Sequence, residues 1–377
     1  MRIFLRRSIF LKEPSMSSPS RRDILKGAAA TGALVFTLSP GKGWAQAWPR
    51  RPITLVIQYA EGGGTDTIMR AIARSLATQL DVSIRAVNQP GAGGALATES
   101  VAGRPADGHW LLGGAEYNKF FRVLGYAKRA PWEEWQFMKV GRSAPSWSVQ
   151  PGSRFKTIND VLEAGRENPG TIRISNAGIG TIWHEATLVA LEYGTGASFV
   201  HVPYDGGAPA ALAVLQNEAE VVASGVHEQV EFLRTDKLRN LAAYVPEPLQ
   251  IDGVAEPLQS VIEAIPSAGQ IGMIQGVYQI AINREAPPEI LQVLNDAVRE
   301  AVSDPAYAQV LHGRVMFPEF VGGADADREA ALFESVTSWL YFENDMQGLV
   351  ASPEELGIPK PEDFAEYWPP EGYKPAF

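Results

Sequence analysis

The sequence has 377 residues, of which 45% are hydrophobic and 20% charged, proportions typical of a globular protein with about two domains. Its 43 Asp and Glu residues outnumber its 33 Lys and Arg residues, and the net charge of −10 argues against a nucleic-acid partner. Cysteine is absent, which excludes a thiol nucleophile, a disulfide framework, a Cys-ligated zinc site and an iron–sulfur cluster.

The first 47 residues differ from the rest in charge and pattern. They hold eight of the 33 basic residues and two of the 43 acidic residues, which leaves 25 basic and 41 acidic residues after them. The pair Arg21-Arg22 is followed by an apolar stretch over residues 27–38, shorter than the roughly 20 residues of a membrane-spanning helix, and by Ala45-Gln46-Ala47. The alternative, a buried first helix, would require neither the arginine pair nor the Ala45-Gln46-Ala47 sequence. We therefore predict a twin-arginine signal peptide over residues 1–47, cleaved after Ala47, and export to the periplasm.

Apolar runs of strand length alternate with helical patterns along the remaining chain. Strands are predicted at 53–57, 82–87, 110–112, 172–175, 199–202, 221–223 and 238–244. Helices are predicted after an N-cap at Thr65 or Asp66, at 95–101, 157–166, 181–193 and 208–215, after Pro287 and Pro305, and at 328–341. This alternation predicts an α/β fold with mainly parallel sheets and helices on both faces. The Pro- and aromatic-rich residues 346–377 are predicted to form a tail over the surface.

Glycine-rich loops follow several of the predicted strands. They lie at residues 61–64, 91–94, 113–114, 178–180 and 206–207. In parallel sheets, ligands bind beyond the carboxyl ends of the strands. Glycine allows the backbone to approach a ligand, and the free N–H groups of a helix's first turn attract anions without Lys or Arg. Any one loop could be a plain turn, but several at one edge predict an anion-binding site.

Catalytic and cofactor motifs are incomplete in this sequence. It contains no P-loop, no complete dinucleotide fingerprint, no nucleophile elbow and no pair of His residues four apart. We therefore expect no resident metal or cofactor and no catalysis. The alternative is an exported α/β enzyme acting on a small carboxylate, in which Glu61, Asp66 and His184 would be acid–base groups.

Several motifs in register resemble those of one family. They are Pro52–Ile57, Gly62–Asp66, Asn88–Gly94, Ala106–Gly108, Gly178–Thr181 with His184, His201–Tyr204, Ala208–Ala210 and Lys237–Ala242. In this order they resemble the solute receptors of the tripartite tricarboxylate transporter family, the Bug-type periplasmic receptors, over roughly residues 48–345. The resemblance implies the two-lobed type II periplasmic binding protein fold, with lobe 1 at 48–142 plus 274–345 and lobe 2 at 143–273.

The resemblance also implies a function. Such a receptor captures a small organic acid in the cleft between its lobes and presents it to membrane permease subunits, and the same fold would serve a ligand sensor for a membrane signalling partner. Carried over by position, the ligand-binding residues would be Tyr59, Glu61, Gly62, Gly63, Gly64, Thr65, Asp66, Gly91, Ala92, Gly93, Gly114, Ala115, Ala177, Gly178, Gly180, Thr181, His184, Tyr204, Asp205 and Ser224.

Two acidic residues depart from the family's usual pattern. Glu61 stands where a small residue is usual, and Asp205 stands where Lys is common. Glu61 either turns to solvent, as Glu usually does, or lies inside the cleft and accepts a hydrogen bond from the ligand. The second hypothesis predicts a monocarboxylate with a donor or cationic group instead of a simple di- or tricarboxylate.

Overall fold

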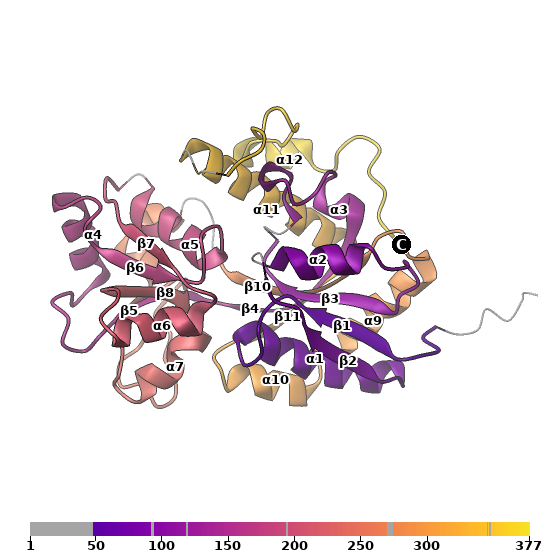
Figure 1. The fold of residues 1–377 in the computed structure, drawn as a ribbon, viewed down its shortest axis with the longest axis horizontal. Coiled ribbons are helices and arrows are strands. Elements are labelled where there is room, and N and C mark those ends of the chain that lie inside the picture. Colours follow the sequence, from indigo (N-terminus) through magenta and orange to yellow (C-terminus); the bar gives the residue numbers. More distant parts are fainter. Residues whose placement is uncertain are drawn as a thin grey trace, which may run out of the picture. The chain divides into compact units, whose positions relative to one another are not determined.

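The computed structural model describes residues 48–91, 94–117, 120–193, 195–269, 274–344, 346 and 348–377. Within them two β-sheets, each flanked by helices, carry the core (Figure 1). The predicted signal peptide and the residues Ala92 and Gly93 lie outside the described residues. In the described part of the chain, no helix is long and apolar enough to cross a membrane.

The first sheet has six strands in the spatial order β11-β4-β10-β3-β1-β2. Strand β1 is parallel to β2 and β3, whereas β10 is antiparallel to β3 and β4, and β11 is antiparallel to β4. The strands are β1 (Ile53–Ile57), β2 (Ile84–Asn88), β3 (Trp110–Ala115), β4 (Trp135–Ser143), β10 (Gly276–Asn283) and β11 (Phe317–Val321).

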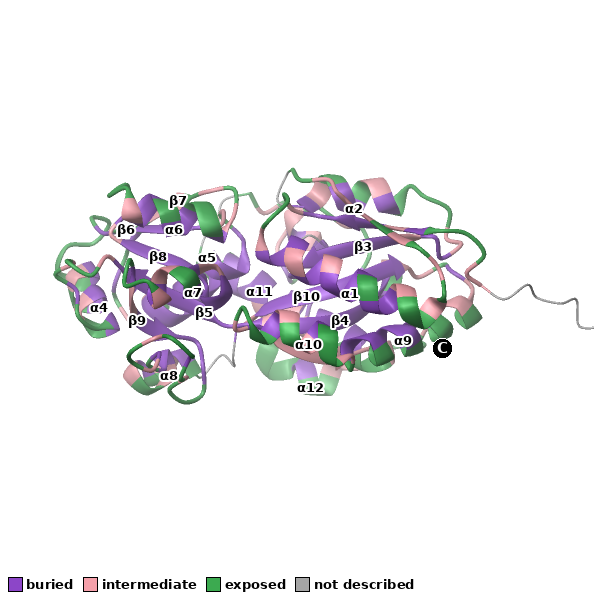
Figure 2. Ribbon diagram, turned by 90° about the horizontal axis from the view of Figure 1, so that it is seen from below, coloured by how far each residue is buried: buried purple, intermediate pink, exposed green. Residues whose placement is uncertain are grey.

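Helices cover both faces of this sheet. One face packs against α1 (Gly64–Leu80), α9 (Pro288–Val302) and α10 (Pro305–His312), through side chains such as Ile68, Leu294 and Leu311. The other face packs against α2 (Ala95–Ala102) and α11 (Gly323–Glu343), and α3 (Pro131–Glu134) lies beside α11. Figure 2 shows the resulting pattern, with buried strands inside and exposed outer helix faces.

The second sheet has five strands in the order β7-β6-β8-β5-β9. Strand β6 is parallel to β7 and β8, and β5 is antiparallel to β8 and β9. The strands are β5 (Pro145–Val149), β6 (Arg173–Asn176), β7 (Val200–Pro203), β8 (Val221–Gly225) and β9 (Arg239–Ala243). One face carries α4 (Ile158–Glu167), α5 (Ile182–Thr187) with its π-helical continuation (Leu188–Glu192), and α8 (Val261–Ala264); the other carries α6 (Gly207–Leu215) and α7 (Val226–Arg234).

Both sheets are mixed, so the prediction of mainly parallel sheets was wrong in this detail. The reason is the way the chain passes between the sheets. Strand β4 ends at Ser143, and β5 of the other sheet begins at Pro145, so one extended segment serves both sheets. Strand β5 enters the second sheet antiparallel to β8, and β10 returns to the first sheet antiparallel to β3, so each runs against the strands of the β–loop–α units.

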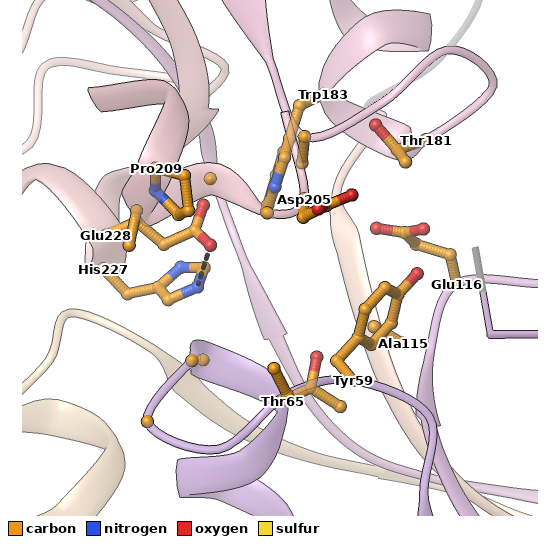
Figure 3. A pocket seen from close by; sticks show the side chains of 18 of the residues that line it. Tyr59, Thr65, Ala115, Glu116, Thr181, Trp183, Asp205, Pro209, His227 and Glu228 are labelled. Atoms are coloured by element: carbon orange, nitrogen blue, oxygen red, sulfur yellow. Dashed lines mark ion pairs between the residues drawn. The ribbon is translucent and has the colours of Figure 1, made fainter. Parts of the chain in front are cut away.

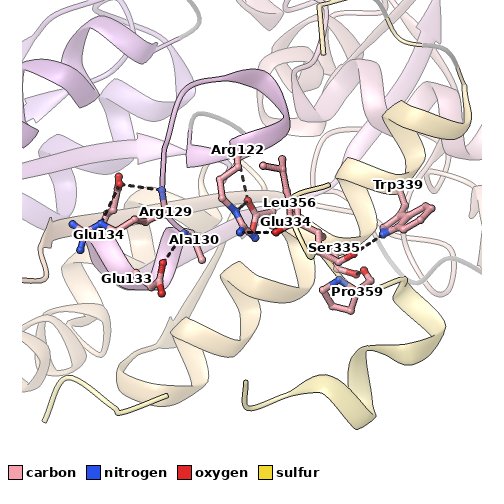
Figure 4. Close-up of polar contacts among 11 residues, drawn as sticks. Arg122, Arg129, Ala130, Glu133, Glu134, Glu334, Ser335, Trp339, Leu356 and Pro359 are labelled. Carbon is pink, nitrogen blue, oxygen red and sulfur yellow. Dashed lines mark hydrogen bonds and ion pairs between the residues drawn. The ribbon is translucent and has the colours of Figure 1, made fainter. Parts of the chain in front are cut away.

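The C-terminal segment, predicted as a surface tail, is held by specific contacts to α11. The Trp339 indole N–H donates to the carbonyl oxygen of Ile358 (3.2 Å), and the Ser335 hydroxyl donates to that of Pro359 (2.8 Å; Figure 4). Phe364 is buried at the start of the short helix α12 (Phe364–Tyr367). Short 3₁₀ turns occur at Arg122–Leu124, Pro266–Gly269 and Pro361–Asp363.

Candidate ligand-binding site

A cavity of about 310 Å³ lies where loops from the two sheets meet (Figure 3). These loops follow β1, β3, β6, β7 and β8, so the cavity lies at the carboxyl ends of strands, where the sequence analysis expected a binding site. The described lining residues are Tyr59, Ala60, Glu61, Gly62, Gly63, Gly64, Thr65, Ala115, Glu116, Ala177, Thr181, Trp183, Asp205, Gly206, Gly207, Ala208, Pro209, His227, Glu228 and Tyr278.

The first turn of α1 opens into this cavity. Its N-cap is Gly63, with an extended backbone (φ −74°) and, among the described residues, no side chain that caps the helix. The following amide N–H groups have no partner within the helix and lie at the positive end of its dipole. This turn is therefore equipped to hold an anion without a basic side chain.

Asp66 stabilises this turn through hydrogen bonds of its side chain. Its carboxylate accepts hydrogen bonds from the backbone of Gly62 (2.9 Å), from Arg70 (2.8 Å) and from Asn88 (2.9 Å). Burial raises the pKa of Asp66, but these hydrogen bonds and the Arg70 charge outweigh burial and keep the pKa below its usual value. Asp66 thus fixes the loop and is not among the residues that line the cavity.

Glu228, in the first turn of α7, occupies the opposite side of the cavity. Its carboxylate accepts hydrogen bonds from the backbone of Gly225 (3.0 Å) and of Gly207, and from the Ser224 hydroxyl. A methyl group on Gly207 would overlap this carboxylate. The backbone amides of Gly207, at the start of α6, and of Gly225, the N-cap of α7, are therefore already bound to a carboxylate of the protein itself.

The ionisation of Glu228 reflects this position. Its side chain is 12% exposed. Burial, together with the negative charge of Glu116, raises the pKa of Glu228 to about 7, although the hydrogen bonds from Gly225, Gly207 and Ser224 act in the opposite direction. Near neutral pH this carboxyl group is poised between its two protonation states.

His227 connects the two halves of the site. Its Nε2 lies 3.1 Å from the hydroxyl oxygen of Tyr278 on β10, and that hydroxyl lies 3.2 Å from Ser143 Oγ. Burial lowers the pKa of His227 to about 3, so the ring is neutral at physiological pH. A methyl group on Gly64 would overlap this ring. The start of α1 and the start of α7 are thus in direct contact.

Glu61 lies at the edge of the cavity. Its side chain is 79% exposed and lies 3.5 Å from Arg70. This geometry favours the first hypothesis for Glu61, in which the side chain turns to solvent. The described residues that line the cavity include no Lys or Arg.

The structure brings together part of the predicted set. The predicted residues that line the cavity are Tyr59, Glu61, Gly62, Gly63, Gly64, Thr65, Ala115, Ala177, Thr181 and Asp205. The predicted residues that do not line it are Asp66, Gly91, Gly114, Gly178, Gly180, His184, Tyr204 and Ser224. The ligand-binding role of each of these residues stays a prediction.

Local contacts explain several of the residues outside the cavity. The Nδ1 atom of His184 accepts a hydrogen bond from the backbone N–H of Gly180 (3.2 Å), so this imidazole stabilises its own loop. Burial, with a smaller contribution from His201, lowers the pKa of His184 to about 3. The Tyr204 hydroxyl donates to Glu218 (2.7 Å).

Three further lining residues, Ala60, Gly206 and Gly207, lie within the segments that the sequence predicted. Sequence reasoning missed the remaining lining residues, namely Glu116, Trp183, Ala208, Pro209, His227, Glu228 and Tyr278. The sequence contained a signal for His227 and Glu228, because they follow the predicted strand at 221–223 and so lie at its carboxyl end. Tyr278 lies within an antiparallel strand, to which the rule about carboxyl ends of parallel strands does not apply. In the described ranges, no three His, Asp or Glu side chains gather as a potential metal site.

Comparison with known proteins places the chain in a family. Residues 68–328 match the model of the family TctC, the tripartite tricarboxylate transporter family receptor. The chain belongs to this family. A relative from Pseudomonas sp. (strain P51), called the UPF0065 protein in the tcbD-tcbE intergenic region, is 29% identical over 335 residues, which are 86% of this chain and 94% of that protein.

One solved TctC structure agrees with this membership, and a second solved structure shares the fold. A TctC solute-binding protein from Polaromonas is 26% identical with a TM-score of 0.61, over 79% of this chain and 100% of that one. The R. palustris protein Rpa4515, solved with adipate, is 22% identical with a TM-score of 0.67, over 80% of this chain and 99% of that one. The predicted family and the two-lobed α/β fold are thereby confirmed.

Proposed function

We propose that this TctC-family chain is a periplasmic solute receptor that binds a small organic acid and delivers it to the permease subunits of a tripartite transporter. The observation that carries the proposal is the first turn of α1, whose residues Gly63, Gly64 and Thr65 line the cavity without a capping side chain among the described residues. A carboxylate placed there would accept hydrogen bonds from these amides and interact with the helix dipole.

The arrangement of the two sheets supports a closing mechanism. The cavity is lined by both sheets, and the contact between His227 and Tyr278 joins α7 of one to β10 of the other. A ligand bound between two such parts favours the closed form if its contacts exist only there. The extended segment around Ala144, between β4 and β5, is one proposed hinge.

The positions of the acid–base candidates favour binding over catalysis. Glu61 is exposed, Asp66 is held behind the α1 turn, and His184 supports its own loop. These groups do not converge on one point in the cavity, so they provide no acid–base pair for a bound substrate. We infer that the ligand leaves the protein chemically unchanged.

The proposed function is tested with a panel of small mono-, di- and tricarboxylates and their neutral amides. At a ligand concentration of about 100 times Kd, binding should stabilise the native protein by about 2.7 kcal/mol, which thermal melting detects. At least one carboxylate should raise the melting temperature while its neutral amide does not, and NMR should recover the ligand unchanged. Failure of every carboxylate, or turnover of the ligand, would contradict the proposal.

A further inference from the structure

We propose that the ligand is a zwitterion, whose carboxylate lies at the first turn of α1 and whose cationic group faces Glu228 and Asp205. This inference rests on the proposed receptor function and names the class of ligand that the receptor selects. It follows from a difference between the two sides of the cavity.

On the side formed by α6 and α7, a carboxylate of the protein itself lies at the helix starts. The backbone N–H groups of Gly207 and Gly225 donate to Glu228, and the carboxylate of Glu228 fills the space beside Gly207. A dicarboxylate that used α1 for one end would bring its other end against this carboxyl group. Two like charges at close range in a poorly solvated site repel strongly.

Asp205 adds a second negative charge to the same cavity from a different element. It lies in the loop between β7 and α6, lines the cavity, and is exposed in the structure. Figure 3 shows Glu228 and Asp205, together with Glu116 from the end of β3, around the cavity. The described lining residues include no Lys or Arg. A cationic group on the ligand would therefore be attracted to Glu228 and Asp205.

Aromatic side chains form a further part of the wall. Tyr59, Trp183 and Tyr278 line the cavity, and Trp183 is 5% exposed. The faces of aromatic rings attract ammonium groups, and the attraction is stronger where water is excluded. These rings therefore suit a cationic group better than a second carboxylate.

The raised pKa of Glu228 also favours a cationic group on the ligand. Its ion-pair contact within the described residues is His227, whose Nε2 lies 3.9 Å away and whose ring is neutral at physiological pH. Burial without a compensating cation raises the pKa of Glu228 to about 7. A cation beside this carboxylate would relieve the cost of its ionisation.

Calorimetry on the purified protein tests the inference with pairs of ligands matched in chain length. Each pair joins an ω-amino acid to the corresponding dicarboxylate: 4-aminobutanoate with succinate, 5-aminopentanoate with glutarate, and 6-aminohexanoate with adipate. α-Amino acids and trimethylammonio acids complete the zwitterion arm. We expect at least one zwitterion to bind about 30-fold more tightly than any dicarboxylate, the factor expected for a partly buried charge pair.

Substitutions then assign the selectivity to residues. Glu228→Gln keeps the shape but removes the charge, and it should weaken zwitterion binding by about 30-fold while dicarboxylate binding stays equal or improves. Asp205→Asn should act in the same direction with a smaller factor, and it decides the question if Glu228→Gln does not fold. Glu231→Gln is the matched control, because Glu231 lies on the same helix with a side chain that is 74% exposed.

The outcomes separate this inference from the proposed function. If a dicarboxylate binds as tightly as the zwitterions, the zwitterion inference is wrong while the receptor function stands. If no carboxylate of either class binds, both are wrong. If zwitterions bind best but Glu228→Gln and Asp205→Asn leave their advantage unchanged, the assignment to these two residues is overturned.

Discussion

The contact between Gly64 and His227 gives a sharp test of how the site closes. Gly64 is the first residue of α1, and a Cβ atom there would overlap the imidazole ring of His227 in α7. The ring has little freedom to move, because it is buried, bonds to Tyr278 and lies beside Trp183. Gly64→Ala should therefore push α1 away from α7.

The size of the effect follows from the packing. Adding a methyl group to a tightly packed site costs about 1–3 kcal/mol. Because α1 belongs to one sheet and α7 to the other, an open form avoids this overlap, and the cost falls on the closed, ligand-bound form. The dissociation constant should rise about 5- to 150-fold, since about 1.4 kcal/mol corresponds to a factor of ten. The melting temperature of the free protein should change little, because Ala is at least as compatible with a helix as Gly.

Two comparisons isolate the overlap as the cause. Gly152→Ala is the control, because an added Cβ there would have no described atom within 4 Å and Gly152 does not line the cavity, so this variant should bind normally. In a His227→Ala background, Gly64→Ala should add no further loss, because the ring is gone. Unchanged affinity in Gly64→Ala would show that α1 and α7 are apart in the bound state. A large loss of stability without ligand would show that the contact belongs to the folded core instead of to closure.

Further expectations concern stability and export. The pKa of Glu228 rises from 4.5 to about 7 on folding, so the ionised group destabilises the protein increasingly as the pH rises through that window. Glu228→Gln removes this penalty. In urea unfolding, its stabilisation relative to the wild type should therefore be larger at pH 8 than at pH 5, by up to about 3 kcal/mol. Arg284→Met removes the partner of the fully buried Asp327 (2.8 Å) and should cost about 3–5 kcal/mol, whereas Arg51→Met, in an exposed pair, should cost less than about 1 kcal/mol. Lysine at Arg21-Arg22 should leave the precursor in the cytoplasm by cell fractionation, and continued export would remove the twin-arginine assignment.

Local signals predicted the β–loop–α units well. The apolar run at 53–57 is β1 with the same bounds, and Thr157 caps α4 with a hydrogen bond from the Asp160 backbone (3.2 Å). In these units the strand, its glycine loop and the following helix are continuous in sequence. The information that fixes them is therefore contained in short windows, which is why half of the cavity could be found from the sequence.

The missing elements depend on contacts distant in sequence. Strand β4 is buried along almost its whole length and β5 throughout, so neither shows the alternation that marks a half-exposed strand. Glu228 gains its role because folding brings it to the amide of Gly207, twenty-one positions earlier in the chain. Neither residue by itself indicates this contact. The sequence predicted the loop that lines the α1 side of the cavity, but the contacts on the opposite side required the structure.

We infer the charge of the ligand from which helix start the protein leaves without an acceptor of its own. A helix start that faces a closed cavity needs an acceptor, because its amides lose water when the cavity closes. At α6 and α7 the protein supplies that acceptor itself through Glu228, whereas at α1 it leaves Gly63 as the N-cap. The first arrangement occupies the amides of Gly207 and Gly225 and introduces a carboxylate beside the cavity. We therefore expect a single acidic side chain at the start of α7 to favour a ligand with a cationic group over a dianion, with the backbone of the fold unchanged.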